Sequence, residues 1–238
     1  MAGHRIIYDF GMNNGDDIEY YLKKGFKVVG VDGNPELCKA CSTRFEQQIA
    51  SGDLHIVNAA LSQTSSIKST RFYIHKTNHV LSRILPPPQE TACDYIKIFV
   101  PQRKASEVVQ EYGEAHYIKI DVEHFDPKVV ADLFGASIFP TFISAELHSI
   151  DVFWLLVAHG YTSFNLVEGR SVSSKYKSTH IQTPNGRQTF SFKQHSAGPF
   201  GEDITTPWMT KEAFFRFLQL KHLGWKDIHA TMRMASHK

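Results

Sequence analysis

Apolar runs alternate with amphipathic stretches along the first sixty positions of the chain. The apolar run Ile6–Phe10 leads into a glycine-containing loop, residues 15–24 are amphipathic, and a second apolar run, Lys27–Asp32, ends on a carboxylate. Short apolar runs predict buried strands, and apolar positions three and four apart predict helices. A helix over residues 36–50 and a strand over Leu54–Asn58 complete a predicted β-α-β-α-β unit.

The same alternation returns after a different kind of segment. Residues 70–101 contain short strand-like pieces at 71–75 and 95–100, separated by a turn at Asn78-His79 and by three consecutive prolines at 86–88. We expect either a lid or substrate wall over the carboxyl edge of the sheet, or a stiff surface loop. Helices and strands then alternate at Ala105–Tyr112, 116–121, 127–134, 141–147, 150–159 and 162–167.

The C-terminal part is predicted to be antiparallel. Asn185-Gly186 indicates a hairpin turn between strands at 179–182 and 189–192. We take 189–192 as the last, antiparallel strand of the sheet, and 210–223 as an amphipathic helix that packs on the domain. The fold class is therefore α/β, with a doubly wound and mostly parallel sheet. We expect one domain over 1–238, comprising a cofactor-binding half (5–65), the insertion (70–101), a catalytic half (104–170) and a C-terminal hairpin and helix (175–238).

The glycine loop decides which cofactor is expected. A dinucleotide site needs G-x-G-x-x-G, but Asn13 and Asp16 follow Gly11 where the later glycines would stand. Asp9, Asp16 and Asp17 would surround the loop with negative charge and repel a phosphate. S-adenosylmethionine has no phosphate and carries two cationic groups. Asp16 and Asp17 also suit the first turn of any helix, because the macrodipole favours acids there.

A carboxylate at the end of the second strand supports this interpretation. Asp32 lies about 20 residues beyond the loop, where an acidic side chain accepts hydrogen bonds from both ribose hydroxyls of a nucleoside.

Four motifs carry a resemblance to a known family. They are D-x-G-x-N-x-G (Asp9, Gly11, Asn13, Gly15), V-D-x-N-P (Asp32, Asn34, Pro35), N-x-A-L-S (Asn58, Ala60, Leu61, Ser62) and I-K-I-D-V-E (residues 118–123). In this order they resemble the FkbM-type family of S-adenosylmethionine-dependent methyltransferases. The resemblance runs from about residue 6 to residue 167.

The resemblance implies a Rossmann-like class I methyltransferase fold and a cofactor site made by Asp9, Gly11, Asn13, Gly15, Asp32, Asn34, Asn58 and Asp121. The family commonly has Glu at the position of Asp32 and Gly at that of His124. The second departure changes the rim of the active site, so the acceptor cannot be carried over from the family.

Polar side chains end two further predicted strands. Asp121 and Glu123 follow one strand, and Glu146 and His148 follow the next. Open parallel sheets bind ligands at this edge, and alternation along a strand directs each pair to one face. Methyl transfer to oxygen or nitrogen requires removal of a proton from the acceptor, for which histidine is suited. We predict His148 as the general base, with Glu146 or Asp121 orienting it or the substrate; Glu123 completes the catalytic set.

Other roles for these side chains stay open. Asp121, Glu123, Glu146 and His148 suit Mg²⁺ or a similar hard cation, although no metal is predicted. Glu146 and His148 are also of the type that forms ion pairs across a sheet edge. We assign Lys119 a structural role, either reaching the edge or pairing with an acid. The remaining histidines of this region, His116, His124 and His159, are expected to be structural or solvent-facing, and Asn78 and Ser82 are left outside the site.

Composition excludes several classes of function. The formal net charge is +2 with scattered Lys and Arg, so no nucleic-acid partner is expected. The apolar run 152–158 is too short to span a bilayer, and no signal region precedes the first strand, so we expect a cytoplasmic protein without a membrane partner. Cys38 and Cys41 fall inside a predicted helix, which indicates buried free thiols rather than a redox or zinc site.

The sequence therefore predicts an S-adenosylmethionine-dependent methyltransferase. The expected acceptor is a hydroxyl on a small molecule or a glycan sugar, although fold and family do not fix the substrate. Two alternatives remain, a non-catalytic nucleotide-binding module and an NAD-dependent oxidoreductase. The oligomeric state is not predicted.

Overall fold

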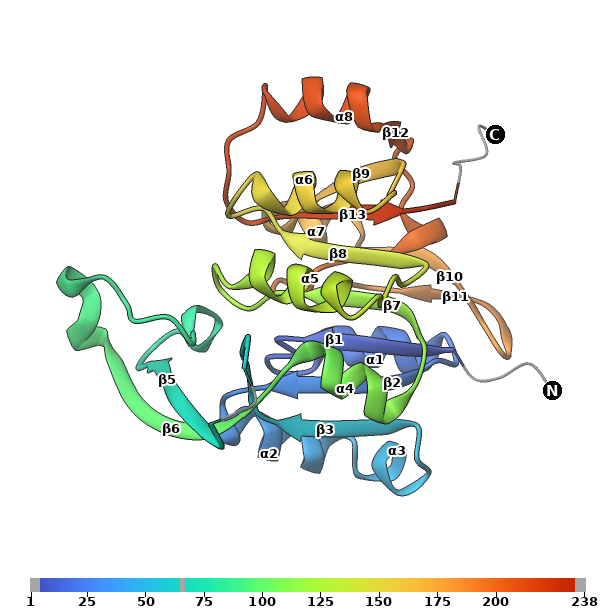
Figure 1. Cartoon of the computed structure of the whole chain (residues 1–238). Helices are drawn as coiled ribbons and strands as arrows, with labels where there is room; N and C mark the ends of the chain where they lie inside the picture. The colour runs from blue at the N-terminus through green and yellow to red at the C-terminus, as the bar shows by residue number, and fades with distance from the viewer. Residues whose placement is uncertain (1–4, 65–66, 234–238) are drawn as a thin grey trace.

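A computed structural model describes residues 5–64 and 67–233. Its centre is an eight-stranded sheet of order β12-β9-β13-β8-β7-β1-β2-β3 (Figure 1). The strands are β1 (Ile6–Phe10), β2 (Lys27–Asp32), β3 (Leu54–Asn58), β7 (Ala115–Ile120), β8 (Phe142–Glu146), β9 (Ser163–Glu168), β12 (Met209–Thr210) and β13 (Lys226–Thr231). Strands β3, β2, β1, β7 and β8 pair in parallel, whereas β13 lies antiparallel between β8 and β9. The expected α/β, mostly parallel sheet is confirmed.

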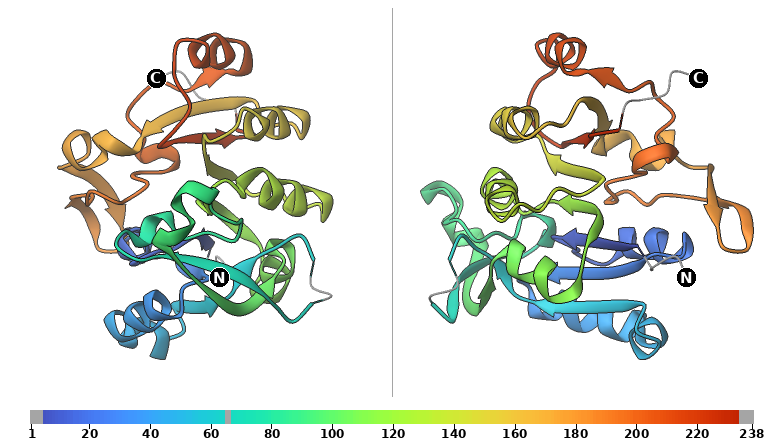
Figure 2. Two further views of the ribbon diagram at one scale, coloured as in Figure 1. Left: turned by 90° about the vertical axis from the view of Figure 1, so that its left-hand side faces the viewer. Right: turned by 45° about the vertical axis from the view of Figure 1, so that its right-hand side comes forward.

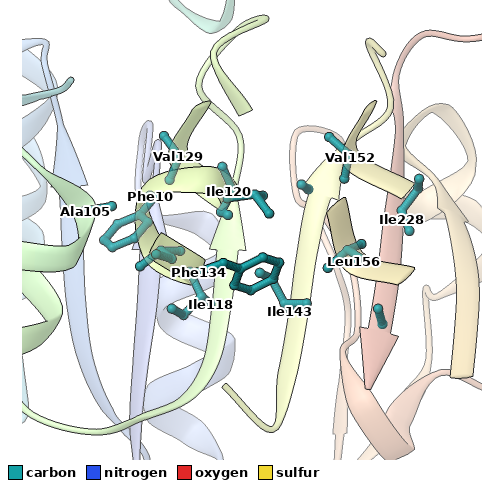
Figure 3. Packing of buried hydrophobic residues seen from close by; sticks show 14 of the residues in the cluster. Phe10, Ala105, Ile118, Ile120, Val129, Phe134, Ile143, Val152, Leu156 and Ile228 are labelled. Carbon is teal, nitrogen blue, oxygen red and sulfur yellow. The ribbon is translucent and has the colours of Figure 1, made fainter. Parts of the chain in front are cut away.

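Helices cover both faces of this sheet (Figure 2). Side chains alternate across a strand, so neighbouring residues of β1 and β7 enter different cores. Phe10, Ile118 and Ile120 pack against one set of helices, as Figure 3 shows, whereas Ile7 and Tyr117 belong to the opposite core. The first core contains α4 (Ala105–Tyr112), α5 (Asp126–Gly135), α6 (Asp151–Ala158) and α8 (Lys211–Leu218); the second contains α1 (Asp16–Lys23), α2 (Pro35–Arg44) and α7 (Val172–Lys175).

The predicted insertion forms a separate small sheet. Strands β5 (Ser69–His75) and β6 (Tyr95–Arg103) are antiparallel, and β4 (Ala60–Leu61) joins β6 in parallel. Two 3₁₀ turns, η1 (His79–Leu81) and η2 (Gln89–Asp94), connect β5 to β6. The insertion extends as an arm past one end of the parallel strands (Figure 1).

The predicted position of the antiparallel strand is wrong. Residues 189–192 do not join the main sheet, because β11 (Gly186–Phe190) pairs only with β10 (Thr179–Thr183). The antiparallel strand inside the sheet is β13, which carries the polar residues Asp227, His229 and Thr231, all of them buried. A buried strand with polar residues at every second position lacks the apolar run by which such strands are recognised.

Two predicted helices have different bounds. The helix expected over 36–50 breaks at Phe45, where φ is −115° and ψ is 29°, and continues as α3 (Glu46–Ala50). The C-terminal helix α8 ends at Leu218 instead of 223, and its Phe214 ring contacts the rings of Phe153 and Phe164. It therefore packs on the domain as expected. No helix among the described residues is both long enough and apolar enough to cross a membrane.

A buried cation connects β1, α1 and β7. The Nζ atom of Lys119 lies 3.0 Å from Asp9 Oδ1, 3.4 Å from Asp17 Oδ2 and 3.7 Å from Asp121 Oδ2, and only 3% of the Lys119 side chain is exposed. Nζ also donates to the Gly11 carbonyl at 3.1 Å. The prediction that Lys119 pairs with an acid is confirmed.

The glycine loop after β1 contacts the end of β7 directly. The Asp121 amide donates to the Phe10 carbonyl at 2.9 Å, and Gly11 adopts a φ of +83°. A Cβ atom on Gly11 would lie 1.8 Å from the Asp121 carbonyl oxygen, so no other residue fits without moving backbone.

Replacing Gly11 by alanine is therefore expected to destabilise the protein severely. Gly52→Ala is the matched control, because Gly52 has a φ of +75° but nothing within 4 Å of the added Cβ. Gly52→Ala should lower the free energy of unfolding by about 1–2 kcal/mol, the cost of the left-handed conformation alone. Gly11→Ala should lower it by more than about 4 kcal/mol in urea unfolding. Equal effects of the two substitutions would contradict the close packing of Gly11 on Asp121.

Removing the buried cation should also be costly. Lys119→Met leaves the Asp9 and Asp17 carboxylates without their partner and should lower the free energy of unfolding by about 3–5 kcal/mol. The control Lys221→Met removes an ion pair with Glu168 whose side chains are 35% and 44% exposed, and should cost about 1 kcal/mol or less. Chemical denaturation of both variants measures the difference, and a Lys119→Met protein as stable as the control would disprove the structural role.

Candidate functional site

A cavity of about 360 Å³ lies at the carboxyl ends of β1, β2, β7 and β8. Its walls come from these strand ends, from the insertion and from two loops of the C-terminal part. Ligands of open parallel sheets bind at this edge, so the cavity is the candidate site. Of the predicted site residues, those that line it are Gly11, Asn13, Asp32, Asp121, Glu123, Glu146 and His148.

The Asp32 carboxylate is held in place by two backbone amides. The amide of Asn13 donates to Asp32 Oδ2 at 3.0 Å, and the amide of Asn34 donates to Oδ1 at 2.8 Å. Burial raises the pKa of Asp32 to about 6, against the opposing effect of these two hydrogen bonds. The structure therefore presents an oriented carboxylate to the cavity at the end of β2.

Besides Asp9, three predicted cofactor residues do not line the cavity. Asn34 caps α2, where its Oδ1 accepts from the Glu36 amide at 3.1 Å. Asn58 Nδ2 donates to the Asp32 carbonyl at 3.0 Å. Gly15 is the N-cap of α1, and a Cβ there would lie 2.9 Å from the Phe45 ring. Asn34 and Asn58 therefore hold Asp32 through hydrogen bonds, and Gly15 begins α1.

The two cysteines of α2 contact the backbone of the cofactor loop and of Asp32. Cys38 and Cys41 are free and buried in α2, as predicted. Cys38 Sγ donates to the Asp32 carbonyl at 3.4 Å, and burial raises its pKa to about 12, so the thiol is protonated and unreactive at neutral pH.

The expected ring of acids around the loop is not present. Asp9 is completely buried against Lys119 and does not line the cavity. Asp16 is bound by Arg44 at 3.0 Å and Lys193 at 2.8 Å. Asp17 accepts from the Ser196 hydroxyl and from the Ala197 amide. Each of these three acids has a structural partner and none lines the cavity, whereas Asp32 and Asp121 do line it beside the loop.

The four predicted catalytic side chains do converge. Oxygen atoms of Asp121, Glu123 and Glu146 lie within 4.8 Å of one another, and His148 Nδ1 lies 3.3 Å from Glu146 Oε2. The alternation of side chains along each strand explains this convergence only in part. Glu123 and His124 lie in a turn after β7, where their φ angles are 46° and 68°. This turn directs Glu123 back toward the strand ends.

Burial shifts the pKa values of this group in opposite directions. It raises the pKa of Glu146 to about 11 and that of Glu123 to about 8, and the Asp121 charge adds to both shifts. It lowers the pKa of His148 to about 4, with a contribution from His124. These carboxyl groups therefore favour the protonated form, and the imidazole favours the neutral form, when no further cation is near.

The histidines left outside the site behave differently from one another. His116 is buried and stacks on Phe26 with 5.3 Å between ring centroids, and His159 is exposed, as expected for structural or surface residues. His124 is exposed, but its ring centroid lies only 3.9 Å from that of His148. It therefore belongs to the rim of the site, where the departure from the family pattern was expected to matter.

The insertion supplies one wall of the cavity, as a lid or substrate wall would. Asn78 and Ser82, which the sequence analysis excluded, line the cavity together with Phe72, Arg83 and Ile84. Residues 86–88 are not part of the lining. Sequence reasoning missed Arg83, His195 and Trp225, because they lie in loops without a periodic pattern or motif. In the sequence, the only indication that these three residues reach the site was the chemical type of their side chains.

Comparisons with known proteins add little to this site. The sequence matches no family model and no curated protein sequence. Among solved structures, precorrin-6y C5,15-methyltransferase from Geobacter metallireducens is similar at 10% identity and a TM-score of 0.42, covering 96% of this chain and 80% of the other. An rRNA methylase from Streptococcus thermophilus is similar at 9% identity and a TM-score of 0.41, covering 97% and 88%.

Fibrillarin from Aeropyrum pernix, solved with bound S-adenosyl-L-methionine, is similar at 12% identity and a TM-score of 0.40, covering 70% of this chain and 60% of that chain. Similarity at this level bears on no residue, acceptor or partner. The strand order, with β13 antiparallel between β8 and β9, itself gives the chain the expected Rossmann-like class I methyltransferase fold.

Proposed function

We propose that this protein is an S-adenosylmethionine-dependent methyltransferase that acts on a hydroxyl of a small molecule or sugar, and that it is a relative of the FkbM-type enzymes. The observation that carries the proposal is the Asp32 carboxylate, fixed by two backbone amides at one end of a cavity whose other end gathers Glu123, Glu146 and His148. Such a carboxylate suits the two ribose hydroxyls of the cofactor.

The loop itself favours a cofactor without phosphate. Its amides are already engaged: those of Gly11 and Met12 donate to the Val31 carbonyl, that of Asn13 to Asp32, and that of Gly15 to the Met12 carbonyl. Phosphate-binding loops use such amides for the anion. A pyrophosphate would also lie beside Asp32 and Asp121, whereas a sulfonium or ammonium group is attracted there.

The acceptor would lie between the insertion and the ends of β7 and β8. Methyl transfer forms a bond from the acceptor oxygen to the methyl carbon, breaks the bond from that carbon to sulfur, and releases the hydroxyl proton. In the protein without a bound ion, the neutral His148 ring is placed to accept this proton, and the Glu146 carboxyl group lies 3.3 Å from its Nδ1 atom. Asp121, next to Gly11, would face the sulfonium.

Asp32→Asn should weaken the binding of S-adenosylhomocysteine at least tenfold, which corresponds to about 1.4 kcal/mol. The amide keeps the shape of the side chain but loses the charge and one acceptor atom. Calorimetric titration measures the effect. The control is Asp53→Asn, because Asp53 precedes the amino end of β3 and the cavity lies at the carboxyl ends of the strands. Equal affinity of the Asp32→Asn variant and the natural protein would exclude the proposed ribose contact.

Binding should also depend on pH through Asp32. Its pKa is about 6 under the influence of burial, the amides of Asn34 and Asn13, and the charges of Lys119 and Asp121. The carboxylate form binds the ribose, so S-adenosylhomocysteine affinity should be constant above about pH 7 and fall as the pH drops through 6, by up to about tenfold per pH unit. The Asp32→Asn variant should lack this component; an identical pH profile in both proteins would contradict the assignment.

Turnover distinguishes the proposal from its two alternatives. Release of S-adenosylhomocysteine from S-adenosylmethionine, with a panel of sugars, polyols and phenols as acceptors, is the expected result. Binding of the cofactor without turnover on any acceptor would favour a non-catalytic module. Binding of NAD, tested in the same titration, would favour an oxidoreductase.

A further inference from the structure

Two overlapping sets of metal-binding side chains meet at the acceptor end of the cavity. Donor atoms of Glu123, His124 and His148 lie within 4.8 Å of one another, and so do those of Asp121, Glu123 and Glu146. Glu123 belongs to both sets. Ligand atoms around one ion with bonds of about 2.1 Å lie roughly 3–4 Å apart, so small side-chain rotations would complete such a shell.

A second observation points to a missing ligand. The Glu146 side chain is 7% exposed and lines the cavity, and among the described residues its only ion-pair partner is His148, whose Nδ1 atom lies 3.3 Å away. That contact is not a hydrogen bond, because His148 Nδ1 is a buried atom without a hydrogen-bond partner. Buried polar atoms are almost always hydrogen-bonded or bound to an ion. The Nδ1 atom of His148, in a side chain that lines the cavity, has no such partner among the described residues.

A cation of the insertion does not fill this role. Arg83 lines the cavity from the insertion and influences Glu123 and His148 electrostatically. Among the described residues, however, its guanidinium forms no ion pair within 4.0 Å of a carboxylate, and its Nε atom is buried without a partner. Among the described residues, Glu123 and Glu146 therefore have no lysine or arginine within 4.0 Å, whereas Asp121 has Lys119 at 3.7 Å.

We infer that Glu123, His124 and His148, together with Glu146 or Asp121, bind a first-row transition-metal dication. Two imidazoles with carboxylates suit Mn²⁺, Fe²⁺, Co²⁺ or Zn²⁺, whereas Mg²⁺ and Ca²⁺ prefer oxygen ligands alone. The site is thus distinct from the hard-cation site that the four catalytic residues suggest in the sequence, because His124 is a ligand in it.

This inference rests on the proposed function for its chemical role. A bound dication would hold the acceptor oxygen next to the cofactor and lower the pKa of its hydroxyl. His148 then serves as a ligand and no longer as the base. With Asp121 as the further carboxylate ligand, the hydroxyl proton passes to the Glu146 carboxylate beside His148. The bonds formed and broken at the methyl carbon are unchanged.

Metal binding can be tested without any turnover. The protein, freed of metal by a chelator, is titrated with Mn²⁺ and Zn²⁺ in the calorimeter, with Mg²⁺ for comparison, and Co²⁺ absorption reports the ligand geometry. We expect one site per chain that prefers Mn²⁺ or Zn²⁺ over Mg²⁺. His124→Ala and Glu123→Gln should each weaken binding at least tenfold. The control is His195→Ala, which removes a histidine that lines the cavity outside the cluster.

Each variant is also titrated with S-adenosylhomocysteine, which separates this inference from the proposed function. Retained S-adenosylhomocysteine affinity in His124→Ala, with loss of the metal site, supports the inference and shows that the variant is folded. No saturable metal site in the natural protein, or equal metal affinity in His124→Ala and His195→Ala, would overturn it. Failure of S-adenosylhomocysteine to bind any of the proteins would instead count against the proposed function.

Discussion

The Lys119 ammonium, buried under the glycine loop, is the interaction on which the site depends. It joins acids from β1 and α1 to Asp121 after β7, and its hydrogen bond to the Gly11 carbonyl fixes the loop from below. Without the cation, the Asp9 carboxylate in β1 and the Asp17 carboxylate in α1 would be buried without a cationic partner. The same contact holds the loop against the end of β7, where the missing Cβ of Gly11 leaves room for the Asp121 carbonyl. Stability and site geometry are therefore linked in one cluster.

Electrostatics divide the cavity into two ends. At the β2 end, a single carboxylate is oriented by amides and faces a loop whose own donors are already used. At the β7 and β8 ends, several carboxyl groups and two imidazoles lie close together, and among the described residues only Asp121 has a lysine or arginine within 4.0 Å, namely Lys119. The β2 end suits the neutral ribose of the cofactor, whose hydroxyls donate hydrogen bonds. The β7 and β8 end suits a group that carries positive charge. A sulfonium cofactor and a bound dication would meet these demands in one cavity.

The sequence predicted the parts of the fold in which local pattern and burial agree. The bounds of β2, β3 and α4 match the prediction because apolar runs or amphipathic spacing define them. Strand β13 was missed because Asp227, His229 and Thr231 are polar yet buried, so burial there depends on tertiary contacts that no local pattern reports.

The convergence of Asp121, Glu123, Glu146 and His148 followed from the rule that parallel strands end at one edge. His195 and Trp225 reach the cavity from the C-terminal part, which only the complete fold brings there. The roles of Asp9 and Asp17 were misjudged for a related reason, since their partners Lys119 and Ser196 are distant in sequence.

In the proposed function, one cavity holds the nucleoside at Asp32 and the reacting sulfur near Asp121 and Glu146. A crystal structure of the protein with S-adenosylhomocysteine would show whether this arrangement is correct. We expect both ribose hydroxyls within hydrogen-bond distance of the Asp32 carboxylate, with the sulfur facing the side chains at the ends of β7 and β8. A nucleoside bound elsewhere, or a ribose turned away from Asp32, would contradict it.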